Sequence, residues 1–200
     1  MIEIVEDRTV MLQHWLPHNA VCAEVGVFNG LFSRMIWEHT APRRLHLIDI
    51  WADIGAEGEW CTSDTKAQGN MMTVSRMFVG PIKAGRVALH QGCSANILAL
   101  FPRAYFDWVY IDADHSYEGV MLDLEASGPL IKQGGLIVGH DYATPEQAQG
   151  IRHYYPGVAR AVTEFCSRYG WRIICLSKQG DYSGPDIAGR NAPSYILARQ

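Results

Sequence analysis

The residues best suited to chemistry lie in two segments, "YIDADHSYEG" and "IVGHDY". The first places Asp112, Asp114 and His115 within four positions, and the second ends an apolar run on His140 and Asp141. Carboxylates and imidazoles that converge on one point suit a divalent cation, and an oxygen-rich set favours Mg²⁺ or Mn²⁺ over structural zinc. If the two segments follow neighbouring strands, they form a candidate metal or proton-transfer site.

The alternative interpretation of these residues is a helix cap. Asp114 and Ser116 could cap a helix that begins near Tyr117, and His140 could be a hydrogen-bonded structural histidine. A cap accounts for one acid, but it does not account for acids that end two adjacent strands. The pattern therefore favours a site and leaves the capping role of Asp114 open.

The chain around these segments alternates between apolar runs and stretches of helical period. The apolar runs are rich in Val, Ile and Leu, which is typical of parallel strands buried on both faces; they are residues 21–27, 44–50, 86–92, 106–112 and 134–140. Helical candidates lie at residues 8–16, 30–40, 71–80, 117–131 and 156–170. Two further strands, residues 171–178 and 193–200, are joined by a long loop and can pair antiparallel.

This alternation predicts a Rossmann-like, doubly wound α/β fold. We expect seven mostly parallel strands, an antiparallel last strand and helices on both faces. We also expect a single domain over residues 1–200, with a helical cover at residues 1–19 and a candidate lid at residues 52–70. In such sheets ligands bind beyond the carboxyl ends of the strands, near the point where the strand order reverses.

The composition argues against several classes of protein. A net charge of −4 and a pI near 6.0 provide no bulk attraction to nucleic acid or to a membrane surface. Five widely spaced cysteines without a C-x-x-C pair argue against a disulfide framework and favour a reducing compartment. The first residues carry acids where a signal peptide needs basic residues, and no run reaches membrane-spanning length. We therefore expect a cytoplasmic protein without nucleic-acid or membrane partners.

The first strand ends in "AEVGVFNG", where Gly26 and Gly30 bracket a turn and could let a ligand approach backbone N–H groups. This spacing is not the dinucleotide fingerprint G-x-G-x-x-G, which counts against a nicotinamide dehydrogenase. Glu24 is an acid inside an apolar strand, so it needs a partner to offset its desolvation. That partner is either an arginine such as Arg34 or a cationic group of a ligand.

The next two strands end in further candidate contacts for a nucleoside. Asp49 lies about twenty residues beyond the glycines, the position from which a carboxylate accepts ribose hydroxyls. Trp51 could cover a flat base or be a core residue. Gly92, Cys93 and Ser94 could contact an adenine edge, although Ser94 is an equally good N-cap for the helix that follows.

Three stretches of the chain together resemble a known family. They are "EVGVFNGLFS", "IDADHSYEGVMLDLEASGPLIKQGGLIVGHDY" and "PGVARAVTEF", and the resemblance covers about residues 20–170. The chain resembles the class I S-adenosylmethionine-dependent methyltransferases. More narrowly, it is similar to the metal-dependent small-molecule O-methyltransferases grouped with macrocin O-methyltransferase and the cephalosporin-hydroxylase-like proteins.

The resemblance implies roles for most of the residues above. The implied cofactor contacts are Glu24, Gly26, Phe28, Gly30, Asp49, Gly92, Cys93 and Ser94. Asn29, Trp51 and Asp112 are further candidate contacts of the cofactor. Asp112, His140 and Asp141 fall at the positions of metal ligands, and Asp114 or His115 falls at that of a catalytic base. Two departures are present: Phe32 followed by Ser33 displaces the usual hydroxyl, and Cys93–Ser94 replaces the usual acid.

The expected function is transfer of a methyl group from S-adenosylmethionine to a hydroxyl of a small, sugar-bearing or similar metabolite, with Mg²⁺ or Mn²⁺. A bound cation lowers the pKa of the hydroxyl and fixes its position for in-line attack. The alternatives are a metal-independent methyltransferase and a non-catalytic protein that binds S-adenosylmethionine or a nucleotide. His153, Tyr154 and Tyr155 could line the acceptor pocket or a subunit interface of a homo-oligomer.

Overall fold

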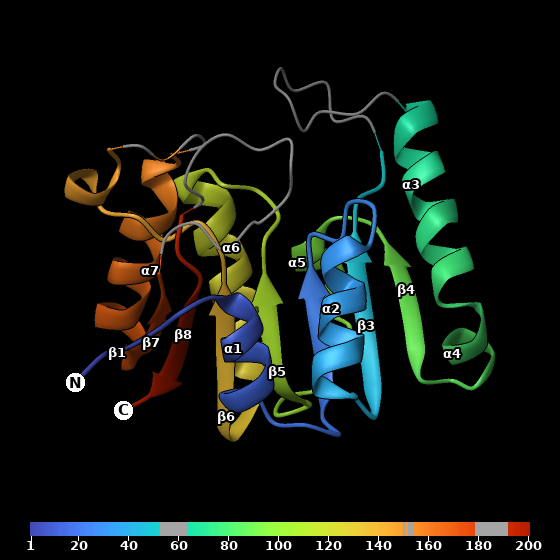
Figure 1. The fold of residues 1–200 in the computed structure, drawn as a ribbon, viewed down its shortest axis with the longest axis horizontal. Helices are drawn as coiled ribbons and strands as arrows, with labels where there is room; N and C mark the ends of the chain where they lie inside the picture. Colours follow the sequence, from blue (N-terminus) through green and yellow to red (C-terminus); the bar gives the residue numbers. More distant parts are fainter. Residues whose placement is uncertain (53–63, 150, 152–153, 179–191) are drawn as a thin grey trace.

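The computed structural model describes residues 1–52, 64–149, 151, 154–178 and 192–200. Its centre is one eight-stranded sheet with the order β1-β7-β8-β6-β5-β2-β3-β4 (Figure 1). The strands are β1 Glu3–Val5, β2 Val21–Val25, β3 Arg44–Asp49, β4 Val87–Gln91, β5 Phe106–Ile111, β6 Ile131–Gly139, β7 Trp171–Ser177 and β8 Tyr195–Arg199. Only β8 runs antiparallel to its neighbours, β6 and β7. The predicted fold class is therefore confirmed.

The strand count differs from the prediction by one. The additional strand, β1, has three residues and pairs in parallel with β7 at the edge of the sheet. Two of its three residues are exposed, so it has no continuous apolar run that would mark it in the sequence. The predicted helical cover at residues 1–19 thus contains a strand as well as a helix.

Helices cover both faces of the sheet (Figure 1). They are α1 Arg8–His14, α2 Leu31–Thr40, α3 Asp64–Met77, α4 Val79–Lys83, α5 Ser94–Leu98, α6 Tyr117–Ser127 and α7 Pro156–Tyr169, with 3₁₀ turns at Gly128–Leu130 and Pro145–Gln147. Helix α3 begins seven residues before the predicted helix at 71–80, and most of the candidate lid, residues 53–63, lies outside the described residues. No helix in the described part of the chain is long and apolar enough to cross a membrane.

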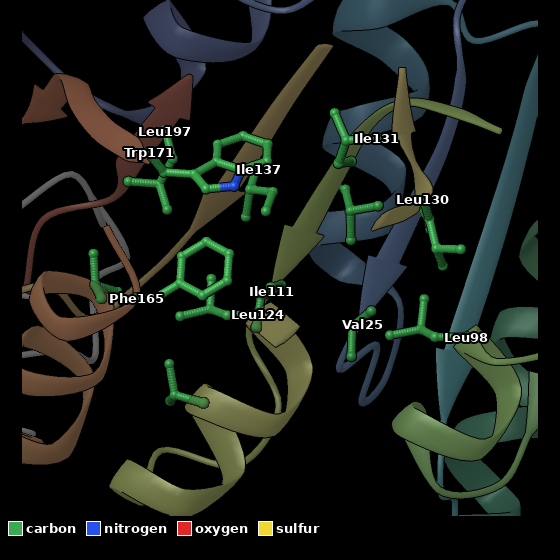
Figure 2. Close-up of a cluster of buried hydrophobic side chains, with 14 of the residues drawn as sticks. Val25, Leu98, Ile111, Leu124, Leu130, Ile131, Ile137, Phe165, Trp171 and Leu197 are labelled. Atoms are coloured by element: carbon green, nitrogen blue, oxygen red, sulfur yellow. The ribbon is translucent and has the colours of Figure 1, made fainter. Parts of the chain in front are cut away.

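Alternate residues of the central strands supply two apolar cores. Val21, Ala23 and Val25 of β2 face the core that α5, α6 and α7 cover, whereas Cys22 faces the core covered by α1, α2 and α3. Figure 2 shows the first core, where Leu124 and Phe165 from two helices meet side chains of the sheet. Full burial of one such side chain contributes about 1.5–3 kcal/mol, so the central strands are held firmly at both faces.

The strand order reverses between β2 and β5. The chain adds β3 and β4 on one side of β2, and then returns to place β5 and β6 on the other. Tyr110 pairs with Val138 and Ile111 pairs with Gly139, so β5 and β6 end side by side. The acids that follow these two strands consequently lie at the same edge of the sheet, next to the reversal point where ligands of such folds bind.

Two histidines form a pair between β3 and β4, and His46 is buried whereas His90 is half-buried. His46 Nδ1 lies 2.9 Å from His90 Nε2, and His46 Nε2 lies 3.3 Å from the Tyr105 hydroxyl. Burial lowers the pKa of His46 to about 3, and the charges of His90 and Arg44 act in the same direction. The pKa of His90 is lowered too, chiefly by burial. Folded His46 therefore stays neutral at neutral and mildly acidic pH.

We predict that acid weakens the fold through this pair, and that His46→Leu reduces the effect. The histidine of the unfolded chain takes up a proton near pH 6.5, whereas folded His46 does not, so stability falls as the pH decreases from 7 toward 3. One such group contributes a slope of at most about 1.4 kcal/mol per pH unit. Urea unfolding at pH 7 and pH 5 measures the slope, and His18→Leu is the surface control. Equal slopes for wild type and His46→Leu would contradict the prediction.

Candidate functional site

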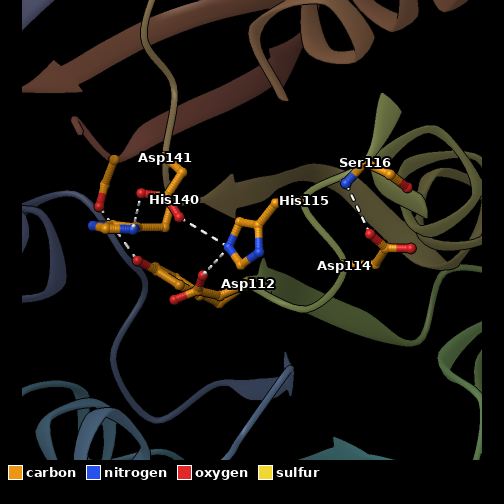
Figure 3. A network of polar contacts seen from close by, with 8 residues as sticks. Asp112, Asp114, His115, Ser116, His140 and Asp141 are labelled. Atoms are coloured by element: carbon orange, nitrogen blue, oxygen red, sulfur yellow. Dashed lines mark hydrogen bonds and ion pairs between the residues drawn. The ribbon is translucent and has the colours of Figure 1, made fainter. Parts of the chain in front are cut away.

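Three side chains converge at the carboxyl ends of β5 and β6. His115 Nε2 lies 3.3 Å from Asp112 Oδ1 and 2.9 Å from Asp141 Oδ2 (Figure 3). Each of the three residues offers a ligand atom, and these atoms lie within 4.8 Å of one another, which is close enough to hold one metal ion. Asp112 directly follows β5, Asp141 is the second residue after the adjacent strand β6, and His115 reaches them from the loop before α6. Residues 112, 115 and 141 are hereafter called the acid–imidazole cluster.

The charges of the acid–imidazole cluster compensate one another. Burial alone would lower the pKa of His115, but hydrogen bonds to Asp112 and Asp141 outweigh it and raise that pKa to about 10. Burial alone would raise the pKa of Asp141, whereas the charges of His140 and His115 hold it well below its usual range. Asp141 also raises the pKa of His140, so two imidazoles compensate the negative charge at Asp112 and Asp141.

His140 lies behind the acid–imidazole cluster. Its Nδ1 is 3.0 Å from Asp141 Oδ1, the carboxylate oxygen that does not contact His115. Its Nε2 is buried and has no hydrogen-bond partner among the described residues. Asp141 is therefore held between two imidazoles, one at each oxygen. Of the three residues expected as metal ligands, the structure brings Asp112 and Asp141 together with His115, and His140 contacts them through Asp141.

Asp114 points away from the acid–imidazole cluster, toward the start of α6 (Figure 3). Its Oδ1 accepts a hydrogen bond of 2.8 Å from the Ser116 amide, and a Cβ on Gly119 would lie 2.4 Å from its carboxyl group. Ser116 is the N-cap of α6, and its Oγ accepts from the Gly119 amide at 3.0 Å. The expected cap is thus present, and Asp114 belongs to it.

The turn after β2 is packed against the backbone of the acid–imidazole cluster. Gly26 has φ +90°, and a Cβ there would lie 2.0 Å from the Asp112 carbonyl oxygen. Gly30 has φ +82°, and a Cβ there would lie 2.8 Å from Val74 of α3. Both glycines therefore have packing reasons for lacking a side chain, in addition to the access for a ligand that the sequence suggests.

Asp49 organises the same turn. Its Oδ2 accepts hydrogen bonds of 2.8 Å from the Val27 and Phe28 amides, and its Oδ1 accepts one of 2.7 Å from the Trp51 amide. A carboxylate offers about four acceptor positions, so Asp49 can still accept from a ribose hydroxyl. Trp51 is 3% exposed, and its indole N–H donates to the Phe28 carbonyl at 3.0 Å, which favours its interpretation as a core residue.

The turn after β4 does not use Ser94 as the helix N-cap, which was one of the two interpretations of this residue. Ser94 is the first residue of α5, and its Oγ donates a hydrogen bond of 2.5 Å to Asp123 Oδ1 of α6, so the suggested N-cap role is wrong. Cys93 occupies the N-cap position and is exposed. The Gly92 amide donates to the Asp49 carbonyl at 2.9 Å, which ties this turn to the one after β3.

Glu24 is buried at the carboxyl end of β2, with 1% of its surface exposed. It accepts a hydrogen bond from Ser33 Oγ, and burial raises its pKa well above the usual range. Arg34 is not its partner, because Arg34 pairs with Glu38 at 2.8 Å on the exposed side of α2. The charge that stabilises the ionised form of Glu24 comes instead from Arg8 of α1.

Two contacts beside the acid–imidazole cluster were not predicted from the sequence, although Tyr155 was expected as a candidate lining residue of the acceptor pocket or of a subunit interface. The ring of Tyr155 stacks on His115 with centroids 4.3 Å apart and an interplanar angle of 22°. Gly157 lets α7 approach closely, because a Cβ there would lie 2.5 Å from the Tyr117 amide nitrogen. The available signal was Pro156–Gly157 at the start of the predicted helix, residues 156–170. His153, another expected lining residue, lies outside the described residues.

A family model described as a methyltransferase domain matches residues 23–142, which include the acid–imidazole cluster and the turns after β2, β3 and β4. The chain belongs to this methyltransferase family. No curated protein matches the sequence.

Solved structures share the fold of this methyltransferase at low sequence identity. The O-methyltransferase from Bacillus cereus, solved in complex with SAH, has 14% identity and a TM-score of 0.64, over 96% of this chain and 80% of that one. The precorrin-6y C5,15-methyltransferase from Geobacter metallireducens has 15% identity and a TM-score of 0.61, over 96% and 85%. The B. subtilis tRNA methyltransferase TrmK has 11% identity and a TM-score of 0.62, over 98% and 67%.

We predict that Asp112→Asn lowers the pKa of His115 in the metal-free methyltransferase. The Asp112 carboxylate is one of the two groups that raise this pKa to about 10, so its removal lets His115 lose its proton at a lower pH. NMR titration of the imidazole carbons between pH 6 and pH 10.5 measures the change. Asp114→Asn is the matched control, because Asp114 bonds to the start of α6. An unchanged His115 titration in Asp112→Asn would contradict the pairing.

Proposed function

We propose that this methyltransferase transfers a methyl group from S-adenosylmethionine to a hydroxyl of a small molecule, with a divalent cation held at Asp112 and Asp141. The family match and the SAH complex of the B. cereus O-methyltransferase support the methyl donor. The sequence resemblance to metal-dependent small-molecule O-methyltransferases supports the finer assignment. The net charge of −4 disfavours RNA as the acceptor, since phosphate binding relies on basic surfaces.

The observation that carries the proposal is the convergence of two carboxylates on one point at the strand reversal. Asp112 and Asp141 both contact His115 Nε2, and both are partly or fully buried. Close carboxylates in such surroundings either share a proton or are stabilised by a cation. In the metal-free protein the imidazolium of His115 provides this charge, and oxygen donors of this kind also fit Mg²⁺ or Mn²⁺.

In this proposal each residue of the acid–imidazole cluster has its own role in the reaction. A divalent cation bound to Asp112 and Asp141 would lower the pKa of the acceptor hydroxyl and hold its oxygen in place. His115 Nε2 accepts the hydroxyl proton, while the acceptor oxygen forms a bond to the methyl carbon. The carbon–sulfur bond of the donor breaks, and its electron pair stays on the sulfur, which gives neutral S-adenosylhomocysteine.

His115 is the better candidate for the base than Asp114. Its Nε2 lies at the carboxylates that would hold the acceptor, whereas the carboxyl group of Asp114 bonds to the start of α6. A pKa near 10 keeps His115 protonated in the metal-free protein, so it cannot accept a proton there. A cation at the two carboxylates replaces the imidazolium charge and lets His115 become neutral. Metal binding should therefore release a proton and prepare the base.

His140 orients Asp141 in this proposal. Its Nδ1 occupies one carboxylate oxygen and leaves the other directed at His115. Such support behind a ligand fixes the geometry of a metal site and strengthens binding.

We predict that Asp141→Ala abolishes both metal binding and methyl transfer, with a loss of activity of about 10³-fold or more. The change removes one of two carboxylate ligands, yet the affinity for S-adenosylmethionine should stay within a few-fold. Mn²⁺ binding is followed by electron paramagnetic resonance, and activity by S-adenosylhomocysteine release with a panel of catechols, phenols and glycosides.

The surface variant Glu38→Ala is the control for Asp141→Ala. Activity should disappear with EDTA and return with Mg²⁺. Full activity in EDTA would favour the metal-independent alternative. Cofactor binding without turnover of any acceptor would favour a non-catalytic binding protein.

We predict that His115→Gln lowers kcat by about 10²–10⁴-fold, because the group that accepts the proton is lost. Asp114→Asn should keep kcat within about tenfold of wild type, since its amide oxygen can still accept from the Ser116 amide. The pH dependence of kcat with a phenol and with a less acidic alcohol measures the effect. Equal losses in the two variants would show that Asp114 takes part in proton transfer.

A further inference from the structure

The first turn of α7 packs against the loop that carries His115. A Cβ on Gly157, the second residue of α7, would lie 2.5 Å from the Tyr117 amide nitrogen and 3.0 Å from the His115 carbonyl oxygen. Any side chain at position 157 would therefore push the helix and the loop apart. This close approach brings Tyr155, the N-cap residue of α7, onto the imidazole of His115.

Two side-chain contacts farther along α7 hold the helix at this loop. The Tyr117 hydroxyl donates a hydrogen bond of 2.8 Å to Glu164 Oε2. The guanidinium carbon of Arg160 lies 4.3 Å from the centroid of the Tyr117 ring. Because both contacts join α7 to the first residue of α6, the start of α7 has a defined position relative to the loop before α6.

The ring of Tyr155 lies nearly parallel to the imidazole of His115, with 22° between the two planes. Tyr155 is half-buried and also packs against the core that α5, α6 and α7 cover. A stacked ring restricts the tilt of its neighbour, since the two planar faces lose contact when one of them turns. Tyr155 therefore limits the directions that the imidazole of His115 can adopt.

The hydrogen bonds of His115 cannot orient it throughout the proposed reaction. In the metal-free protein its Nε2 is directed by Asp112 at 3.3 Å and by Asp141 at 2.9 Å. A base that is ready to accept a proton carries none on Nε2, so it cannot donate to either carboxylate. A cation at these carboxylates would also compete for the same oxygens. The contact with Tyr155 involves neither Nε2 nor the carboxylates, and it can persist in both states.

We propose that Tyr155 is a positioning residue, which holds the imidazole of His115 in place for proton transfer by stacking on it. The inference rests on the proposed role of His115 as the base. It assigns this task to the start of α7, beyond the matched segment 23–142, for the state in which the hydrogen bonds to Asp112 and Asp141 are lost. A displacement of about 1 Å can lower an enzymatic rate by about 10²-fold, so the orientation of the base affects the rate strongly.

The first measurement is NMR of the metal-free protein without substrate. Nuclear Overhauser effects between the ring protons of Tyr155 and His115 report the stack in wild type. A stacked tyrosine also shifts the imidazole protons upfield, so Tyr155→Leu should move them downfield and Tyr155→Phe should leave them near their wild-type positions. The carbon shifts of the same imidazole report its protonation and separate that effect from loss of the stack. Tyr169→Leu, at the other end of α7, is the matched control.

The second measurement is the steady-state rate with whichever catechol, phenol or glycoside wild type methylates fastest. We expect Tyr155→Leu to lower kcat by about 10–10²-fold, and to change KM for S-adenosylmethionine and the Mn²⁺ affinity by less than about threefold. Tyr155→Phe should keep kcat within about threefold of wild type, because it retains the ring. In a His115→Gln background, Tyr155→Leu should cause no further loss, because a residue that acts through His115 then has no base to position.

Several results would overturn the role of Tyr155 and leave the proposed function intact. They are the absence of the Overhauser effects in wild type, an unchanged kcat in Tyr155→Leu, and losses that multiply in the double variant. Multiplied losses together with a raised KM for the acceptor would show that Tyr155 contacts the substrate instead. If wild type transfers no methyl group to any acceptor of the panel, the proposed function and this inference are overturned together.

Discussion

The site depends on the close approach between the turn after β2 and the backbone after β5. The Asp112 amide donates to the Val25 carbonyl at 2.8 Å, and the Gly26 amide donates to the Ile48 carbonyl at 2.9 Å. Three strand ends are tied together in this way, and there is no room for a side chain on Gly26. Because Asp112 begins on this fixed backbone, the position of its carboxylate follows from how β2 and β5 end.

Four acids are gathered at this edge, and three kinds of partner compensate them: backbone amides, imidazoles and a hydroxyl. Backbone amides hold Asp49, two imidazoles hold Asp141, and the Ser33 hydroxyl holds Glu24. Asp112 shares its imidazole with Asp141. The kind of partner is related to the role of each acid. Asp49, which accepts from backbone amides, shapes a turn. The acids that are bonded to an imidazole or a hydroxyl have partners whose protons can be transferred.

The sheet could be predicted from the sequence because its central strands are long, continuous apolar runs between helical segments. The same topology placed Asp112 and Asp141 together, since adjacent parallel strands end at one edge. The directions of the histidines could not be predicted. Asp141 has φ +60°, and the ring of Tyr155, forty residues beyond His115, stacks on that imidazole, so the arrangement depends on loop geometry and on contacts distant in sequence.

The contacts of α1 and α7 have a consequence for how this enzyme can change. Arg8 comes before the segment common to the family, and Tyr155 comes after it, yet both reach the edge where β2, β5 and β6 end. The matched segment, residues 23–142, supplies the acids and the turns. The two flanking segments, before residue 23 and after residue 142, supply side chains that lie beside them. Substitutions in the two flanks would thus change the surroundings of the acid–imidazole cluster while leaving its acids and the neighbouring turns in place.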